Sequence, residues 1–118
     1  MEKLKLFTYK AKVLSVYDGD TITVDIDLGL SVFASGEKIR LHRINAPEVR
    51  GKSKKSGLKS RNYLRKLLLE KEIYLETIKD RKEKFGRYLG EIFIKEKEKF
   101  VNVNDLLVKK GFANYKKY

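Results

Sequence analysis

Asp20 is the first residue of the chain whose type and position could support chemistry. It follows the tight Asp18-Gly19 turn and shares the alternation of Ile22 and Val24, which predicts an inward-facing side chain. A carboxylate on the core side of a strand is costly unless a metal ion or an arginine compensates it. A turn aspartate that accepts backbone N–H groups fits the same pattern, so both interpretations stay open.

Glu48 is a second candidate, because it follows Pro47 outside regular structure and close to the end of a predicted strand. A carboxylate held by a rigid turn can act as a general base. With an ordinary pKa of ~4.3 it would be ionised at neutral pH. Taken alone, the position also fits an ordinary surface glutamate.

Two arginines are informative in a chain that otherwise prefers lysine. Arg40 lies in a predicted strand and Arg87 begins another. A guanidinium group matches phosphate in a planar, bidentate way that an ammonium group cannot. The alternatives are surface ion pairs, of Arg40 with Asp25 or Asp27 and of Arg87 with Glu83.

Positive charge dominates the chain, with a formal net charge of +12 at pH 7. Such an excess favours a polyanionic partner, with nucleic acid before an anionic membrane, although a lysine-rich surface without function is an alternative. Residues 50–66 contain no acidic residue and eight basic ones: Arg50, Lys52, Lys54, Lys55, Lys59, Arg61, Arg65 and Lys66. Residues 115–118 place two lysines between Tyr115 and Tyr118, which suits base stacking and phosphate contacts, unless the segment is a frayed tail.

Composition excludes several kinds of chemistry. The 118 residues predict a single domain, 1–118, and the absence of cysteine excludes disulfides and thiolate catalysis. His42 is the only histidine, so a three-histidine metal site and a histidine-based triad are excluded, and we expect it to be a partly exposed strand residue. No signal peptide or membrane-spanning segment is visible, which predicts a cytoplasmic protein as written, or a secreted one if a leader was removed.

The predicted elements form a mainly β protein with helices. We expect strands at residues 9–17, 21–28, 37–44, 72–78 and 87–94, and a helix at residues 57–69. A last helix is capped by Asn102 and ended by Gly111. Ile22, Val24, Ile26 and Leu28 are expected on the inner face of the second strand. The order predicts an OB-fold, a five-stranded closed β-barrel with a helix between strands 3 and 4 and a C-terminal helix.

Four segments in order resemble the staphylococcal nuclease-like (thermonuclease) family. They are the sequences VYDGDTI at residues 16–22, RLHRINAPE at 40–48, KFGRYLG at 84–90 and VNVNDLLVKKGFA at 101–113. The resemblance covers most of the chain. It implies an OB-fold and a monomeric endonuclease that hydrolyses single-stranded or frayed DNA or RNA with little sequence preference.

The resemblance also implies roles for individual residues. Arg40 and Arg87 would clamp the phosphoryl oxygens, and Glu48 would be the general base that acts on the attacking water. Lys84 and Phe85 match positions that contact a neighbouring phosphate, and Phe85 replaces a tyrosine, so it has no hydroxyl to donate.

A calcium site is implied as well, held by Asp20, by the side chain of Asn45 and by the backbone carbonyl of Ala46. Asn45 departs from the family pattern, which has aspartate there. An amide oxygen can bind calcium, but the site loses one negative charge, and calcium affinity depends on the charge of its ligands. A non-catalytic nucleic-acid-binding module with a weakened metal site is therefore the alternative function.

Asn45→Asp restores the missing charge. We expect tighter calcium binding and higher activity at limiting calcium, because a carboxylate replaces an amide among the ligands. Titration calorimetry on the two proteins measures the affinity directly, and equal or weaker binding by the variant would contradict the assignment of Asn45 to the metal.

Overall fold

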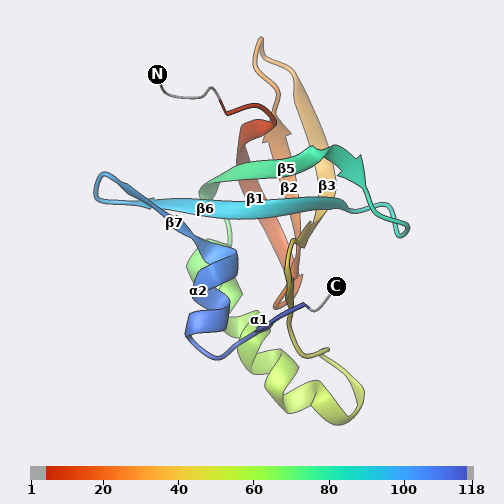
Figure 1. The fold of residues 1–118 in the computed structure, drawn as a ribbon. Coiled ribbons are helices and arrows are strands. Elements are labelled where there is room, and N and C mark those ends of the chain that lie inside the picture. The colour runs from red at the N-terminus through yellow and green to blue at the C-terminus, as the bar shows by residue number, and fades with distance from the viewer. Residues whose placement is uncertain (1–4, 117–118) are drawn as a thin grey trace.

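The computed structural model describes residues 5–116, and five of its strands close into a barrel (Figure 1). The barrel strands are β1 (Thr8–Asp18), β2 (Thr21–Asp27), β3 (Phe33–Leu41), β5 (Glu72–Lys82) and β6 (Tyr88–Glu96). Four neighbouring pairs are antiparallel, and the parallel pairing of β3 with β6 closes the ring. The predicted OB-type barrel is confirmed.

Two helices pack at one end of the barrel (Figure 1). The remaining elements are β4 (Ile44–Asn45), the short 3-10 helix η1 (Gly51–Ser53), α1 (Lys54–Leu68), β7 (Lys99–Asn102), α2 (Val103–Lys109) and β8 (Asn114–Tyr115). Helix α1 lies between the third and fourth barrel strands, as predicted, and β4 pairs with β8 near the C-terminal end. Within residues 5–116, no helix is long and apolar enough to cross a membrane.

Strand β2 shows how the alternation of the sequence builds the core. Ile22, Val24 and Ile26 are buried, as predicted. Leu28 was expected on the same face, and this prediction is wrong, since 49% of its surface is exposed. The strand ends at Asp27, whose Oδ1 accepts a hydrogen bond from the Gly29 amide at 2.8 Å and turns the chain away from the core.

The third predicted strand is longer at its start and broken at its end. It begins at Phe33 rather than at residue 37 and stops at Leu41. Arg43 then adopts a left-handed conformation with φ 71°, which interrupts the ladder before β4. His42 therefore lies in a turn, half-buried, and not in a strand, and burial is the main cause that lowers its pKa.

Other boundaries differ for local reasons. Helix α1 begins at Lys54 rather than at residue 57, so the lysines expected in a loop lie in η1 and in the first turn of the helix. Strand β5 continues to Lys82 because a bulge with left-handed Lys79 and Asp80 carries it past residue 78. Strands β7 and β8 were not predicted. At the last helix the Asn102 side chain caps the N-terminus and Gly111 has φ 83°, both as predicted.

Asn104 ties helix α2 to the barrel. Its side chain is fully buried. The amide nitrogen donates to the carbonyls of His42 at 2.9 Å and Gly90 at 3.1 Å, and the amide oxygen accepts from the Ile92 N–H at 3.2 Å. One side chain thus satisfies backbone groups of β6 and of the turn after β3.

Asn104→Ala should lower the free energy of unfolding by about 2–4 kcal/mol, because it leaves the His42 carbonyl and the Ile92 amide buried without this partner. Urea denaturation followed by circular dichroism measures the change. Asn62→Ala, an exposed site on α1, is the control and should stay within about 0.5 kcal/mol of the wild type. An equal effect at both sites would contradict the role given to Asn104.

Candidate active site

The hairpin between β1 and β2 holds two carboxylates with different tasks. Asp18 accepts the Asp20 amide at 3.0 Å and closes the turn. Asp20 is 6% exposed, and its Oδ2 accepts the amide of Ala46, 26 residues away, at 2.7 Å. The turn role suggested for Asp20 therefore belongs to Asp18, and Asp20 joins the hairpin to the segment after β4.

Arg40 provides the charge that compensates Asp20. Its Nη2 lies 3.4 Å from the Asp20 Oδ2 and also donates to the Asn45 Oδ1, while Nη1 donates to the Leu41 carbonyl at 2.7 Å. The alternative pairing with Asp25 or Asp27 is wrong. Asp27 instead accepts the backbone amide of Gly29 just after β2, and Asp25 accepts that of Gly36 in β3.

Close packing at two glycines positions the segment that carries Glu48. A Cβ atom on Gly19 would lie 2.7 Å from the Cβ of Ala46 and 2.8 Å from that of Ser60 in α1. A Cβ atom on Gly57 would lie 2.0 Å from the carbonyl oxygen of Glu48. The missing side chains let the hairpin, the β4 segment and α1 meet at distances that no larger residue would permit.

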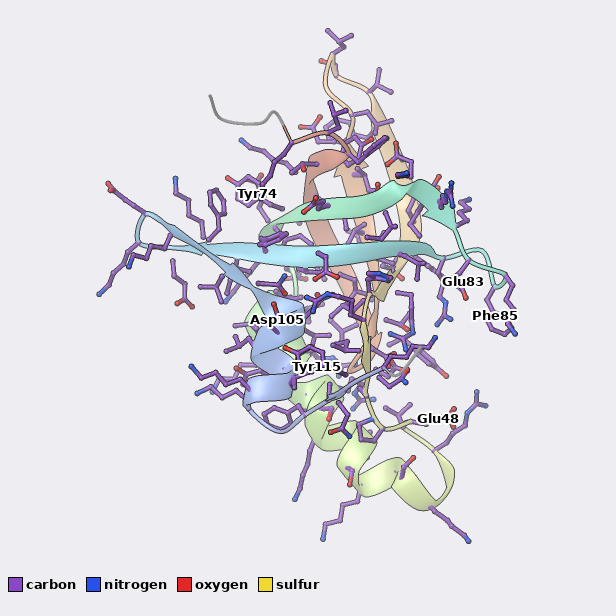
Figure 2. The ribbon with its side chains drawn as sticks, in the orientation of Figure 1. Glu48, Tyr74, Glu83, Phe85, Asp105 and Tyr115 are labelled. Atoms are coloured by element: carbon purple, nitrogen blue, oxygen red, sulfur yellow. The ribbon has the colours of Figure 1, made fainter. Side chains whose placement is uncertain are left out.

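Arg87 forms the ion pair that the sequence offered as its alternative. Its Nε and Nη2 donate to the two carboxylate oxygens of Glu83 at 3.0 and 3.1 Å. These bonds are the main cause that lowers the pKa of Glu83 to about 2. The third nitrogen, Nη1, donates to the Thr21 hydroxyl at 3.3 Å, so the guanidinium group is held beside the hairpin. Glu83 and Phe85 lie on the β5–β6 turn, which projects from the barrel (Figure 2).

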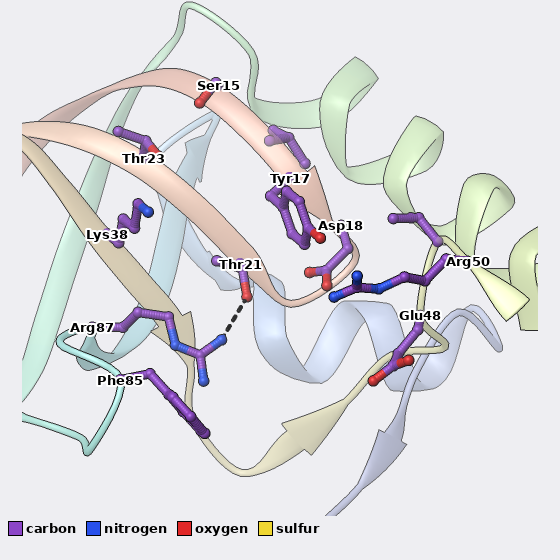
Figure 3. A pocket seen from close by; sticks show the side chains of 12 residues that line it. Ser15, Tyr17, Asp18, Thr21, Thr23, Lys38, Glu48, Arg50, Phe85 and Arg87 are labelled. Carbon is purple, nitrogen blue, oxygen red and sulfur yellow. Dashed lines mark hydrogen bonds between the residues drawn. The ribbon is translucent and has the colours of Figure 1, made fainter.

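These elements enclose a cleft of about 720 Å³ (Figure 3). Its floor is the β1–β2 hairpin with Asp18 and Thr21, and Arg87 approaches from one side. Glu48 and Arg50 stand on the opposite side, and Arg50 extends toward Asp18. Burial is the main cause that raises the pKa of Asp18 to about 6, and the hydrogen bond and charge of Asp20 add to it.

Comparison with known proteins identifies the family. A model described as staphylococcal nuclease homologue matches residues 38–118. The chain belongs to the staphylococcal nuclease family. It is 30% identical over 128 aligned positions to an uncharacterized protein of Methanocaldococcus jannaschii, covering 89% of this chain and 58% of that protein. It is 30% identical over 110 positions to a thermonuclease of Staphylococcus hyicus, covering 91% and 59%.

A third relative in the same range is an uncharacterized protein of Bacillus anthracis, 33% identical over 118 positions that cover 94% of this chain and 50% of that protein. The chain thus spans between 50% and 59% of the length of these relatives. The match to the staphylococcal nuclease family begins at Lys38, so the hairpin with Asp20 lies outside it. The place of that hairpin in the site is supported by the contacts of Asp20 with Arg40 and Ala46.

The oxygen atoms around Asp20 suit a hard divalent cation. Among residues 5–116 no three acidic or histidine side chains converge as a metal cluster. Asp18 and Asp20 nevertheless crowd two carboxylates together, and the Asn45 amide oxygen is linked to Asp20 through Arg40. Calcium takes carboxylate, amide and backbone carbonyl oxygens, so these donors fit the ion, and few of them carry a negative charge.

The predicted site residues separate into three groups in the structure. Asp20, Arg40, Asn45 and Ala46 form one connected cluster. Glu48, Phe85 and Arg87 border the cleft. The remaining predicted residues, Lys52, Lys54, Lys55, Lys84 and Tyr115, do not line it.

Lys84 and Phe85 line an adjoining groove of about 300 Å³ that also contains Arg40 and Arg87. Phe85 is 70% exposed and lies under two cations, with Lys84 Nζ 5.1 Å and Arg87 Cζ 5.5 Å from the ring centre. The exposed Lys52, Lys54 and Lys55 lie in η1 and the start of α1, outside both hollows.

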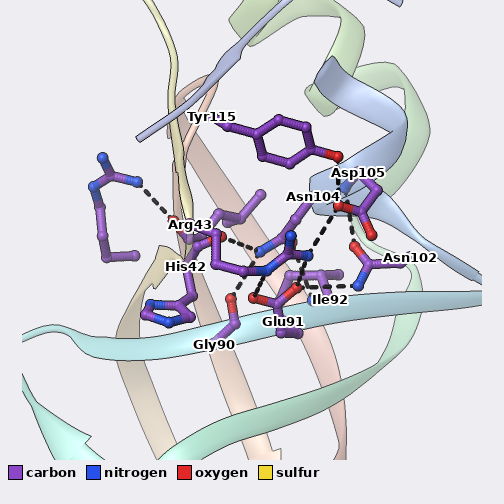
Figure 4. A network of polar contacts seen from close by, with 11 residues as sticks. His42, Arg43, Gly90, Glu91, Ile92, Asn102, Asn104, Asp105 and Tyr115 are labelled. Atoms are coloured by element: carbon purple, nitrogen blue, oxygen red, sulfur yellow. Dashed lines mark hydrogen bonds and ion pairs between the residues drawn. The ribbon is translucent and has the colours of Figure 1, made fainter. Parts of the chain in front are cut away.

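Tyr115 is part of a polar network rather than a member of the cleft (Figure 4). Its hydroxyl donates to the Asp105 Oδ1 at 2.8 Å, which is the main cause that raises its pKa. The Arg43 Nη2 donates to the same Asp105 oxygen at 2.9 Å and to the Glu91 Oε1 at 2.6 Å. Its Nε donates to the Glu91 Oε2 at 3.0 Å. The last two residues of the predicted tail, Lys117 and Tyr118, lie outside the described residues.

Sequence reasoning missed the partners that hold the site in place. Arg43 and Asn104 lie within the family-like segments and Glu91 just after one, but no local pattern gave them a role, because their contacts cross more than ten residues of chain. Thr21 had a usable signal, since it follows Asp20 at the start of a strand. Its hydroxyl bonds to both Asp20 and Arg87.

Gly57→Ala tests how Glu48 is positioned. The added methyl group would meet the Glu48 backbone, so we expect a loss of about 1–3 kcal/mol in the free energy of unfolding and a displaced Glu48. Thermal unfolding measures the stability. Ser56→Ala, the exposed neighbour in α1, should be neutral or slightly stabilising because alanine favours helix. A Gly57→Ala protein as stable as Ser56→Ala would rule out this packing constraint.

Proposed function

We propose that this chain is a calcium-dependent nuclease that hydrolyses phosphodiester bonds of DNA or RNA with little sequence preference. The observation that carries the proposal is the pairing of the buried Asp20 with Arg40 in the hairpin region, next to a cleft that Arg87 and the open Glu48 border. The thermonuclease of Staphylococcus hyicus among the relatives supports the same class of reaction. Because the chain spans only part of its relatives, this is a proposal for the domain.

The two arginines bind the reacting phosphate in this proposal. Arg40 lies in β3 and Arg87 immediately before β6, and each is already oriented by a carboxylate, Asp20 or Glu83. Donors that are fixed before the reaction stabilise charge that grows in the transition state without reorganising. The guanidinium groups therefore bind the phosphoryl oxygens and favour the pentavalent transition state over the ground state.

Glu48 accepts the proton of the attacking water. Its side chain makes no hydrogen bond with any described residue, so its carboxylate is available in the cleft, while its carbonyl is fixed by the Ser53 hydroxyl at 3.0 Å. A positioned base contributes roughly 10²–10⁴-fold to such a step. The contact with Gly57 keeps the base at the edge of the cleft.

Asp20, Asn45 and the Ala46 carbonyl would hold the calcium ion. When bound, calcium supplies a Lewis acid that polarises the phosphoryl oxygen. Asp18 adds negative charge beside these ligands, which partly offsets the neutral Asn45.

The substrate proposed is single-stranded nucleic acid, bound by a monomer, as the resemblance to the family implies. Lys84 and Phe85 would contact the neighbouring nucleotide. Lys52, Lys54 and Lys55 would add outer phosphate contacts through long-range attraction, and Tyr115 would stack on a base. The net charge of +12 supports a polyanionic substrate.

A non-catalytic nucleic-acid-binding module is the second candidate. The neutral Asn45 favours it, because its amide oxygen already accepts a hydrogen bond from Arg40 and brings no charge to the metal. Such a module would bind DNA or RNA in a salt-dependent way without cutting it.

Three substitutions test the nuclease proposal. Glu48→Gln, Arg40→Lys and Arg87→Lys should each lower the rate of calcium-dependent cleavage of denatured DNA by at least about 100-fold, because the base or a bidentate phosphate contact is lost. Gel or fluorescence assays with calcium and with chelator measure the rate.

Glu96→Gln, at the exposed end of β6, is the matched control and should cut like the wild type. Circular dichroism should show the same fold for all four variants. Wild-type protein that binds DNA but cuts under no metal would favour the binding module. Cutting by Glu48→Gln at the wild-type rate would exclude Glu48 as the base.

A further inference from the structure

A second row of polar side chains runs beside the candidate active site. In the register of β1, β2 and β3, Asp18 pairs with Thr21 and Thr21 with Arg40. Two positions further along β2, Thr23 stands between Ser15 and Lys38. The first row contains the proposed reaction centre.

Side chains two residues apart on a strand share a face and lie roughly 6.6 Å apart, so the second row continues the same surface. Ser15, Thr23 and Lys38 all line the large cleft (Figure 3). Lys38 is exposed and forms no ion pair with any residue that the structure describes. A lysine with two hydroxyl groups beside it can bind one phosphate group.

Tyr17 adds an aromatic surface to this end of the cleft. Its ring is 56% exposed, although it neighbours the half-buried Asp18, and its hydroxyl bonds to no described residue. Figure 3 shows the ring between Thr21 and Asp18, facing the open cleft. An exposed ring next to phosphate-binding groups is the arrangement with which proteins stack single-stranded bases.

The reaction centre therefore lies between two hollows. The smaller groove, with Lys84 and Phe85, extends to one side, and the row that ends in Lys38 extends to another. Phe85 and Arg87 border both. Because the two hollows share these residues, one nucleic-acid strand can contact both.

We propose that Tyr17 and Lys38 form a second nucleotide subsite for single-stranded nucleic acid, with the base on the ring and the phosphate on the ammonium group. The subsite takes the nucleotide that follows the reacting phosphate on the side away from Lys84. This inference rests on the proposed function. A site that holds nucleotides on both sides of the reacting phosphate favours cleavage within a nucleic-acid strand over removal of its terminal nucleotides.

Binding of two eight-nucleotide ligands tests the subsite, with a metal chelator present to prevent cleavage. One is fluorescent octathymidylate, and the other has the same phosphates with abasic sugars. Fluorescence anisotropy should show that Tyr17→Ala weakens octathymidylate binding about tenfold and leaves binding of the abasic ligand unchanged, since stacking needs a base.

Lys38→Ala should weaken the binding of both ligands. The logarithm of the association constant falls as the logarithm of the salt concentration rises. Lys38→Ala should make this fall less steep by about 0.7, the value for one phosphate contact to a single strand. Phe100→Ala and Lys99→Ala are the controls, since Phe100 is 58% exposed and both residues lie on β7, away from the cleft. Neither control should change affinity or slope.

The subsite is overturned if Tyr17→Ala weakens both ligands equally, or if Lys38→Ala behaves like Lys99→Ala. Wild-type protein that binds neither ligand would overturn the subsite and the proposed function together. Wild-type protein that binds as expected, responds to both substitutions, but cuts no DNA with calcium would support the subsite and reject the nuclease proposal alone.

Discussion

The buried carboxylate of Asp20 is the interaction on which the geometry of the site depends. It accepts the amide of Ala46 and lies against Arg40, so it joins the β1–β2 hairpin, strand β3 and the segment that follows β4. An unpaired charge in this position would strongly destabilise the fold. The contact is possible only because Gly19 lets the hairpin approach Ala46 and helix α1 closely.

A second polar network holds the same segment from its other end. Arg43 leaves β3 in a left-handed conformation and reaches Glu91 and Asp105, while Asn104 satisfies the backbone on both sides of the turn. Within residues 5–116 no buried side-chain polar atom lacks a hydrogen-bond partner. Networks that are fully satisfied favour one arrangement of the chain, which explains how a segment without regular structure can carry a defined site.

The candidate phosphate-binding arginines are paired before any substrate arrives. Arg87 is held by Glu83 and Arg40 by Asp20, and these carboxylates fix the direction of each guanidinium group. A phosphate must share or replace these partners, which lowers affinity but orients the donors. Asn45 accepts a hydrogen bond from Arg40 through a neutral amide oxygen, whereas an aspartate in its place would add a second charged partner for Arg40. The neutral amide leaves more of the guanidinium charge for a phosphate.

The sequence by itself determined the order of the five barrel strands and the two helices, and it identified residues whose types could support chemistry. Alternation in β2 predicts Ile22 and Val24 in the core and places Asp20 on the same side, and the caps at Asn102 and Gly111 are local signals that hold in the structure. These features depend on neighbours in the chain, so a one-dimensional pattern is enough to find them.

Tertiary structure decided which partner each charged residue takes. The sequence offered Arg40 two aspartates on the next strand, but the fold gives it Asp20 and Asn45, whereas Arg87 takes the nearby Glu83. The glycine contacts that position Glu48 exist only once α1 packs against the hairpin and the β4 segment, and the row from Ser15 to Lys38 exists only once β1, β2 and β3 pair. Pairing is decided by distance in space, and the barrel brings together side chains that the chain keeps far apart.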